Sequence, residues 1–147
     1  MRNESARPRV LLDTKPLIKL FAKEEGWEAV QKIVSRIEAS EIDAGVSVVT
    51  LTEIYCKYLQ EVKIDLANAR TQELRYATYL TKLDVNEDVA VKAGEFKGKY
   101  KIPIADAFIA ATAYFASSTI ITDDPDFKLI HEIKTMTEKE FISNPPA

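Results

Sequence analysis

The sequence predicts an α/β fold, a three-layer α/β/α sandwich around a mainly parallel central sheet. Short apolar runs alternate with longer amphipathic segments along the chain, which is typical of a parallel sheet with helices on both faces. The 147 residues are 46% hydrophobic and 29% charged, the composition of an ordinary globular domain with a proper core. No repeat or low-complexity linker divides the sequence, so we expect a single domain over 1–147, with flexible tails at 1–8 and 143–147.

The first half of the chain should contain two strands and four helices. Its apolar runs are short enough for central strands, and Pro16 suits the start of a helix because a first turn leaves its N–H groups unpaired anyway. Trp27, Val30 and Ile33 recur at helical spacing. In order, we expect a strand at 9–12, helices from Pro16 and over 24–39, a strand at 46–49, and helices over 51–62 and 66–79.

The second half should add three strands and two helices. Gly98 is a good residue for the left-handed cap that closes a helix, and the segment that begins at Pro103 is apolar around its whole circumference, as in a buried helix. In order, we expect a strand at 82–85, a helix over 87–97, a helix over 103–116, a strand at 119–122 and a short strand within 131–136.

Four acidic residues each lie where a buried apolar segment meets a turn or a helix start. Their contexts are VLLDT, VVTLTE, PIADAF and IITDD, which contain Asp13, Glu53, Asp106 and Asp124. In an α/β sheet, ligands bind outside the carboxyl ends of the strands. Carboxylates gathered there would repel one another unless a cation joined them. The chain has only one cysteine and one histidine, so carboxylate oxygens are the available ligands, and these indicate Mg²⁺ or Mn²⁺ rather than zinc. Such a metal site suggests metal-assisted phosphodiester chemistry.

Each acid also has a purely structural interpretation. Asp13 can equally be the cap of the helix that follows it. Thr50 and Glu53 form a T-x-x-E pattern before a helix, and this local evidence favours a capping box. Asp106 would lie in a first turn, where the helix dipole favours an anion. Its neighbours are apolar, however, and a dipole alone compensates poorly for burial of a carboxylate, so Asp106 is the acid that most favours a function.

The last acidic segment is a turn that contains three aspartates. Asp123, Asp124 and Asp126 surround Pro125, and a turn rich in Asp and Pro needs no function. Capping and turn formation explain each acid separately. They do not explain why acids from four separate segments should meet at one edge of the sheet.

In order, the segments LLDTKPLI, TLTEI, IADAFIAATA and IITDDPDF closely resemble the four motifs of the PIN-domain nucleases. Within that family the chain looks most like the VapC-type ribonuclease toxins of toxin–antitoxin pairs. The resemblance covers roughly residues 10–141. The third motif is the most specific, because D-A-x-I-A-A-T-A seldom arises by chance. A PIN-like fold and a metal-dependent endoribonuclease are what this resemblance implies.

The resemblance also implies roles for single residues. Thr14 matches the small hydroxyl residue after the first acid, whereas Lys15 departs from the pattern and could contact phosphate or weaken metal binding. The fourth acid fits a T-x-D position counted from Thr122, although Asp123 and Asp126 are close by. The metal ligands and catalytic residues implied are Asp13, Glu53, Asp106 and Asp124, with Glu53 placed to orient or deprotonate the attacking water.

The expected substrate is single-stranded or looped RNA, whose backbone can enter an acidic cleft. A net charge of −3 argues against indiscriminate binding of polyanions. The lysines of 92–101, with Tyr100, could hold RNA or could simply complement a helix end. No signal-peptide core or membrane-length apolar run is present, so we expect a cytoplasmic protein that does not enter a membrane.

The family resemblance further implies a homodimer and an antitoxin partner. Helices with Trp27, Ile33, Ile37, Tyr55 and Tyr58 could bury their apolar stripes internally or offer them to either partner. An alternative is a non-catalytic PIN-like module for RNA binding or assembly, which retention of all four acids disfavours. A receiver-like phosphoacceptor domain fits poorly, because it needs an acidic pair after its first strand, where this chain has Asp13 and Thr14.

Overall fold

The computed structural model describes residues 9–143 and contains one five-stranded sheet. The expected tails at 1–8 and 143–147 lie outside these residues, except for Ser143, which ends the last helix. All four strand pairings are parallel, which confirms the predicted sheet. In the spatial order β3-β2-β1-β4-β5, the strands are β3 (Leu80–Leu83), β2 (Asp43–Ser47), β1 (Arg9–Leu12), β4 (Thr119–Ile121) and β5 (Lys134–Met136).

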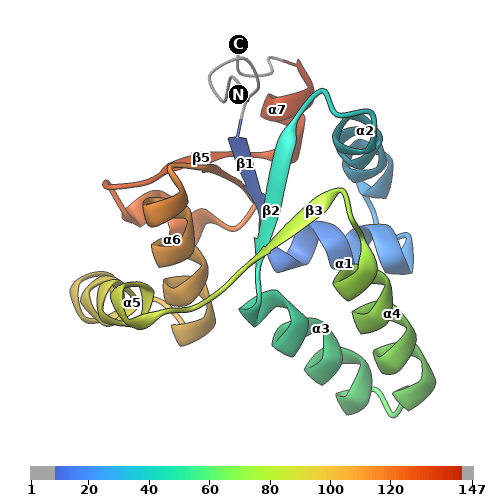
Figure 1. Cartoon of the computed structure of the whole chain (residues 1–147), viewed down its shortest axis with the longest axis horizontal. Coiled ribbons are helices and arrows are strands. Elements are labelled where there is room, and N and C mark those ends of the chain that lie inside the picture. The colour runs from blue at the N-terminus through green and yellow to red at the C-terminus, as the bar shows by residue number, and fades with distance from the viewer. Residues whose placement is uncertain (1–8, 144–147) are drawn as a thin grey trace.

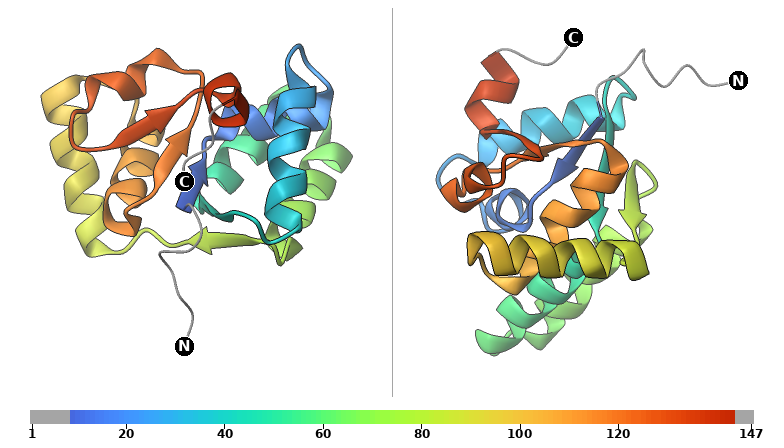
Figure 2. Two further views of the ribbon diagram at one scale, coloured as in Figure 1. Left: turned by 90° about the horizontal axis from the view of Figure 1, so that it is seen from above. Right: turned by 90° about the vertical axis from the view of Figure 1, so that its left-hand side faces the viewer.

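Helices cover both faces of the sheet, as the sequence predicts (Figure 1). On one side lie α1 (Thr14–Ala22), α2 (Trp27–Glu38), α3 (Val49–Gln60), α4 (Ile64–Tyr76) and the short α7 (Glu138–Ser143). On the other side α5 (Glu87–Tyr100) lies across α6 (Ile104–Ala116) and is the outer of the two (Figure 2). A 3₁₀ helix, η2 (Pro125–Leu129), links β4 to β5.

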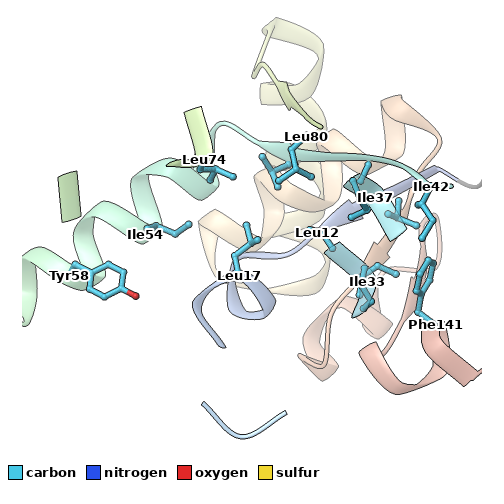
Figure 3. Close-up of a cluster of buried hydrophobic side chains, with 14 of the residues drawn as sticks. Leu12, Leu17, Ile33, Ile37, Ile42, Ile54, Tyr58, Leu74, Leu80 and Phe141 are labelled. Atoms are coloured by element: carbon cyan, nitrogen blue, oxygen red, sulfur yellow. The ribbon is translucent and has the colours of Figure 1, made fainter. Parts of the chain in front are cut away.

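The core has two halves, separated by the sheet. In β1, Val10 and Leu12 point toward one half and Leu11 toward the other, because successive strand residues alternate between faces. Figure 3 shows the first half, where Leu12 meets Leu17 of α1 and Ile33 of α2. A strand buried on both faces reads as a continuous apolar run, which is why β1 was easy to predict.

The second strand and the helix after it begin earlier than expected. The sequence predicted a strand over 46–49 and a helix from Leu51. The strand instead ends at Ser47, and Val48 already has helical backbone angles, with φ −58° and ψ −23°. The Ser47 hydroxyl accepts the Val49 N–H at 3.1 Å. The polypeptide therefore passes from β2 into α3 with almost no intervening loop.

The end of α5 also differs from the prediction. Gly98 does not cap this helix, which continues to Tyr100 and ends at Lys101 in the left-handed conformation, with φ 57°. The Lys97 ammonium donates to the Ile102 carbonyl at 3.0 Å, so one lysine of the segment 92–101 binds the backbone just beyond the helix end. Lys99 approaches Glu132 to 3.5 Å.

The apolar stripes suggested as partner surfaces are mostly internal. Ile33, Ile37 and Tyr58 are buried in the core, whereas Trp27 and Tyr55 are partly exposed. Within residues 9–143, none of the helices has the length and apolar character that a membrane span requires.

Candidate functional site

The four acids of the sequence motifs come together at the carboxyl ends of the strands. Asp13 follows β1 and caps α1, Glu53 lies on α3 just after β2, and Asp106 is in the first turn of α6. Asp124 follows β4 and caps η2. The helices α1, α3 and α6 all begin at this end of the sheet (Figure 1). The charges of Asp13, Asp124 and Glu53 all act on the Asp106 carboxyl, as expected for one cluster.

The tightest group in the cluster includes Asp126, which the sequence left open as either a turn residue or an alternative fourth acid. Asp106, Asp124 and Asp126 each place a carboxylate oxygen within 4.8 Å of those of the other two. Asp126 lies in the first turn of η2, where its N–H donates to Asp124 Oδ1 at 3.0 Å. Pro125 makes this tight turn possible, so the D-P-D sequence brings two carboxylates to the same position.

Asp123 is oriented differently from its two neighbours. Its Oδ2 lies 2.9 Å from the Lys19 ammonium, and its Oδ1 accepts the Glu138 N–H at 3.1 Å. Both of its oxygens are therefore occupied by partners outside the acid cluster. Of the three aspartates that the sequence could not separate, Asp124 and Asp126 belong to the cluster geometry and Asp123 does not.

Two threonine hydroxyls hold the acids in place. Thr122 donates to Asp13 Oδ2 at 2.7 Å and accepts the Asp124 N–H at 3.0 Å. Thr14 donates to Glu53 Oε1 at 2.5 Å. Each hydroxyl thus joins two separate segments of the chain through an acid of the cluster. The role of Thr14 and Thr122 in this geometry is to orient those carboxylates.

The capping interpretation of Glu53 is wrong. The residue that precedes α3 is Val48, which makes no side-chain cap, so Thr50 lies inside the helix. The Thr50 hydroxyl is fully buried and lies 3.0 Å from the Thr14 hydroxyl. In a capping box the acid occupies the third helical position, which is Leu51 in α3. Glu53 lies two residues farther along, and its carboxylate instead accepts from the Thr14 hydroxyl. Asp13, in contrast, does cap its helix, with Oδ1 accepting the Thr14 N–H at 2.8 Å.

Two of the acids, Asp13 and Asp106, have pKa values well above the ordinary range of aspartate, so they keep their protons to a higher pH. Burial raises the pKa of Asp13 to about 6, against the opposing effect of its hydrogen bonds from Thr122 and Thr14. Burial also raises the pKa of Asp106 to about 7, and the charges of the surrounding acids add to this shift. A divalent cation bound between these carboxyl groups would offset the repulsion among their charged forms. The all-oxygen donor set fits such a cation.

The pH dependence of the metal-free protein follows from these pKa values. Because the folded-state pKa values exceed the ordinary 3.8, the folded protein keeps protons that the unfolded chain releases between about pH 4 and pH 7. These two carboxyls should therefore lower the free energy of unfolding as pH rises through that interval. Cation binding needs the charged carboxylates, so Mn²⁺ affinity should rise over the same range.

Thermal unfolding in EDTA and calorimetric titration with Mn²⁺, at several values from about pH 5 to about pH 8, would measure both effects. The Asp106→Asn variant is the matched control for stability, because it lacks the carboxyl with the higher pKa. Its metal-free stability should fall less steeply with pH than that of the wild type. An equal slope for both proteins would contradict the predicted shift at Asp106.

One cation lies at the rim of the cluster. Lys15 places its ammonium 3.9 Å from Asp124 Oδ2, and 70% of its side chain is exposed. An ion pair this long and this exposed contributes little to stability. Its position leaves both interpretations from the sequence open, namely contact with a phosphate and competition with a metal ion.

Comparison with known proteins agrees with the motif pattern. The family model of the PIN domain matches residues 10–133. Ribonuclease VapC4 of Mycobacterium tuberculosis is 32% identical over 98 residues, which cover 63% of this chain and 75% of that protein.

Solved structures share the fold at low sequence identity. VapBC2 of Rickettsia felis, bound to a DNA fragment from its promoter, has a chain with a TM-score of 0.72 and 16% identity, over 88% of this chain and 98% of that one. VapC20 of Mycobacterium tuberculosis, a sarcin–ricin loop cleaving toxin, gives a TM-score of 0.67 and 18% identity, over 81% and 92%.

Proposed function

The chain belongs to the PIN domain family, and from this premise we propose that it is a metal-dependent endoribonuclease, the toxin of a toxin–antitoxin pair. The observation that carries the proposal is the carboxylate cluster, in which acids from four separate segments meet at the carboxyl ends of a parallel sheet. The 32% identity to a ribonuclease of this type supports the same activity.

The proposed metal ligands are Asp13, Glu53, Asp106 and Asp124, with Asp126 as a further donor. An Mg²⁺ or Mn²⁺ ion held there would promote ionisation of the attacking water and offset charge on the departing oxygen. Thr122 fixes the Asp13 carboxylate and the backbone of Asp124. Thr14 occupies one oxygen of Glu53, which leaves the other free to accept a proton from water or to orient it.

The proposed substrate is single-stranded or looped RNA. A cluster of acids repels a phosphate backbone, so a flexible strand that approaches through the cation is favoured over a rigid duplex. The similar VapC20 is a sarcin–ricin loop cleaving toxin, which makes a stem-loop RNA a suitable second substrate to test.

Two protein partners complete the proposal, an antitoxin and a second copy of this chain. A solved structure with the same fold is a toxin–antitoxin complex from Klebsiella pneumoniae, which supports the antitoxin partner. The stripes on α2 and α3 are largely internal, but one exposed apolar patch lies at the α3–α4 turn. There Leu59, Val62 and Ile64 are 46%, 90% and 53% exposed, which supports contact with an apolar segment of a partner.

The first test is cleavage of a mixed-sequence RNA and of a stem-loop RNA with Mg²⁺ or Mn²⁺ present. Cleavage should require the metal, stop on addition of EDTA and be lost in an Asp13→Asn/Asp106→Asn double variant. A folded protein that neither cleaves either RNA nor binds Mn²⁺ would refute the proposal and favour a non-catalytic module for RNA binding or assembly.

A further inference from the structure

A network of charged residues lies beside the acid cluster, and no sequence motif indicated it. The Lys19 ammonium, on α1, lies 2.9 Å from Asp123 Oδ2 and 3.1 and 3.0 Å from the two carboxylate oxygens of Glu138. Asp123 joins β4 to η2, and Glu138 begins α7. Glu138 is only 3% exposed. Three elements that are distant in the sequence therefore meet at one ammonium group.

The network connects the same two segments that carry Asp13 and Asp124. Asp13 caps α1, the helix that carries Lys19, and Asp124 directly follows Asp123. Within residues 9–143, two other polar side-chain contacts join these segments, namely the hydrogen bond from the Thr122 hydroxyl to Asp13 and the long contact of Lys15 with Asp124. The Glu138 N–H, which donates to Asp123, adds the start of α7 to the same point.

Stability alone is a weak explanation for this arrangement. Burial of a carboxylate with an ammonium costs desolvation that their attraction repays only when the geometry is good, and apolar residues of similar size often serve as well. Such a network does, however, specify one geometry, because removal of one member leaves the others unpaired. Loss of Lys19 would leave the Asp123 and Glu138 carboxylates to repel each other next to the metal site.

We propose that Lys19, Asp123 and Glu138 are positioning residues, which fix the backbone of residues 122–124 so that Asp124 faces Asp13 in the geometry that binds a divalent cation. The inference rests on the proposed metal site. Asp123 acts through Lys19 and the start of α7 and does not bind the metal itself. Lys19 sets the distance between α1 and the segment after β4, and Glu138 holds Lys19 in place.

The test is direct Mn²⁺ binding by a Lys19→Met variant, measured by calorimetry well below its unfolding temperature. Lys57→Met is the matched control, because Lys57 pairs at 2.8 Å with Glu61, which follows the end of α3, and within residues 9–143 it contacts none of the acids of the cluster. Lys19→Met should bind Mn²⁺ at least about tenfold more weakly, and Lys57→Met should bind within about twofold of the wild type. Lys19→Arg, which can still donate to both carboxylates, should recover most of the affinity.

The outcomes separate this inference from the proposed function. Normal Mn²⁺ affinity in folded Lys19→Met protein would overturn the positioning role and leave the metal site intact, whatever the variant does to thermal stability. Absence of Mn²⁺ binding in the wild type would overturn the metal site and this inference together. If Lys19→Met does not fold, Glu138→Gln keeps the side-chain shape and removes one charge. It should weaken Mn²⁺ binding in the same direction, and unchanged affinity would again overturn the role.

Discussion

Replacement of Asp106 with asparagine is expected to stabilise the metal-free protein and, at the same time, to abolish its stabilisation by Mn²⁺ and reduce its RNA cleavage. The Asp106 carboxyl is partly buried, and its pKa is raised to about 7 by burial and by four neighbouring acids. Asparagine has the same shape and no charge to repel. After allowance for partial exposure, the gain at about pH 8 should be ~1–2 kcal/mol, or roughly 2–8 °C in Tm for a chain of this size. Cleavage should fall by about 10²–10⁴.

Asp88→Asn is the matched control for this prediction. Asp88 occupies the first turn of α5, just as Asp106 occupies the first turn of α6, but it is exposed and lies outside the acid cluster. If Asp106 only complemented a helix dipole, both variants would lose about 0.3–1 kcal/mol. Thermal unfolding with EDTA and with Mn²⁺ distinguishes the two roles. A destabilised metal-free Asp106→Asn protein that still gains stability from Mn²⁺ would refute the cluster model.

The fold was largely predictable because its central strands are buried on both faces. The run of Val10, Leu11 and Leu12 supplies both halves of the core, and such a run has few interpretations other than a central strand. Element boundaries were harder to predict. Gly98 is chemically suited to a left-handed cap, yet the helix continues to Tyr100 because Lys101 adopts that conformation instead. In this conformation the Lys101 N–H donates to the Lys97 carbonyl at 2.8 Å, which closes the last turn of the helix.

The pattern T-x-x-E occurs three times in this chain, from Thr50, Thr135 and Thr137, and its meaning depends on the backbone before it. At Thr137 it is a true capping box, because the Glu140 N–H donates to the Thr137 hydroxyl and the Thr137 N–H donates to Glu140. At Thr50 the helix has already begun two residues after β2. The same letters then place Thr50 and Glu53 against Thr14. The sequence alone does not reveal where a strand passes into a helix without a loop.

The acids of the candidate site were found by their context, but their partners were not. The T-x-D spacing from Thr122 favours Asp124 as the fourth acid, but only tertiary contacts show which of Asp123 and Asp126 lies beside it. Asp123 turns toward Lys19, whose position among apolar residues of α1 gave the only local signal of a buried partner. Glu138 gave none, since it lies in a polar segment that resembles exposed surface.

Asp13 should reveal two separate roles when it is replaced in two different ways. Its Oδ1 accepts the Thr14 N–H at 2.8 Å as the cap of α1, and its Oδ2 accepts the Thr122 hydroxyl at 2.7 Å. Asparagine keeps one oxygen with which to cap the helix as aspartate does, and its amide nitrogen can donate to the Thr122 hydroxyl in place of accepting from it. Alanine leaves a buried N–H and a buried hydroxyl without this acceptor. Asp13→Ala should therefore lose ~2–4 kcal/mol of unfolding free energy in EDTA, and Asp13→Asn should lose little or gain some.

Both Asp13 variants should lose RNA cleavage to a similar extent, by about 10²–10⁴, because neither keeps the charge that a cation needs. Denaturant unfolding in EDTA measures the structural role, and cleavage with Mn²⁺ measures the chemical one. The two effects must separate in the asparagine variant. Its helix cap is intact, and it lacks the Asp13 carboxyl, whose pKa of about 6 leaves a buried charge above that pH. A stable Asp13→Asn protein that still cleaves RNA would reduce Asp13 to a helix cap and would remove it from the proposed metal site.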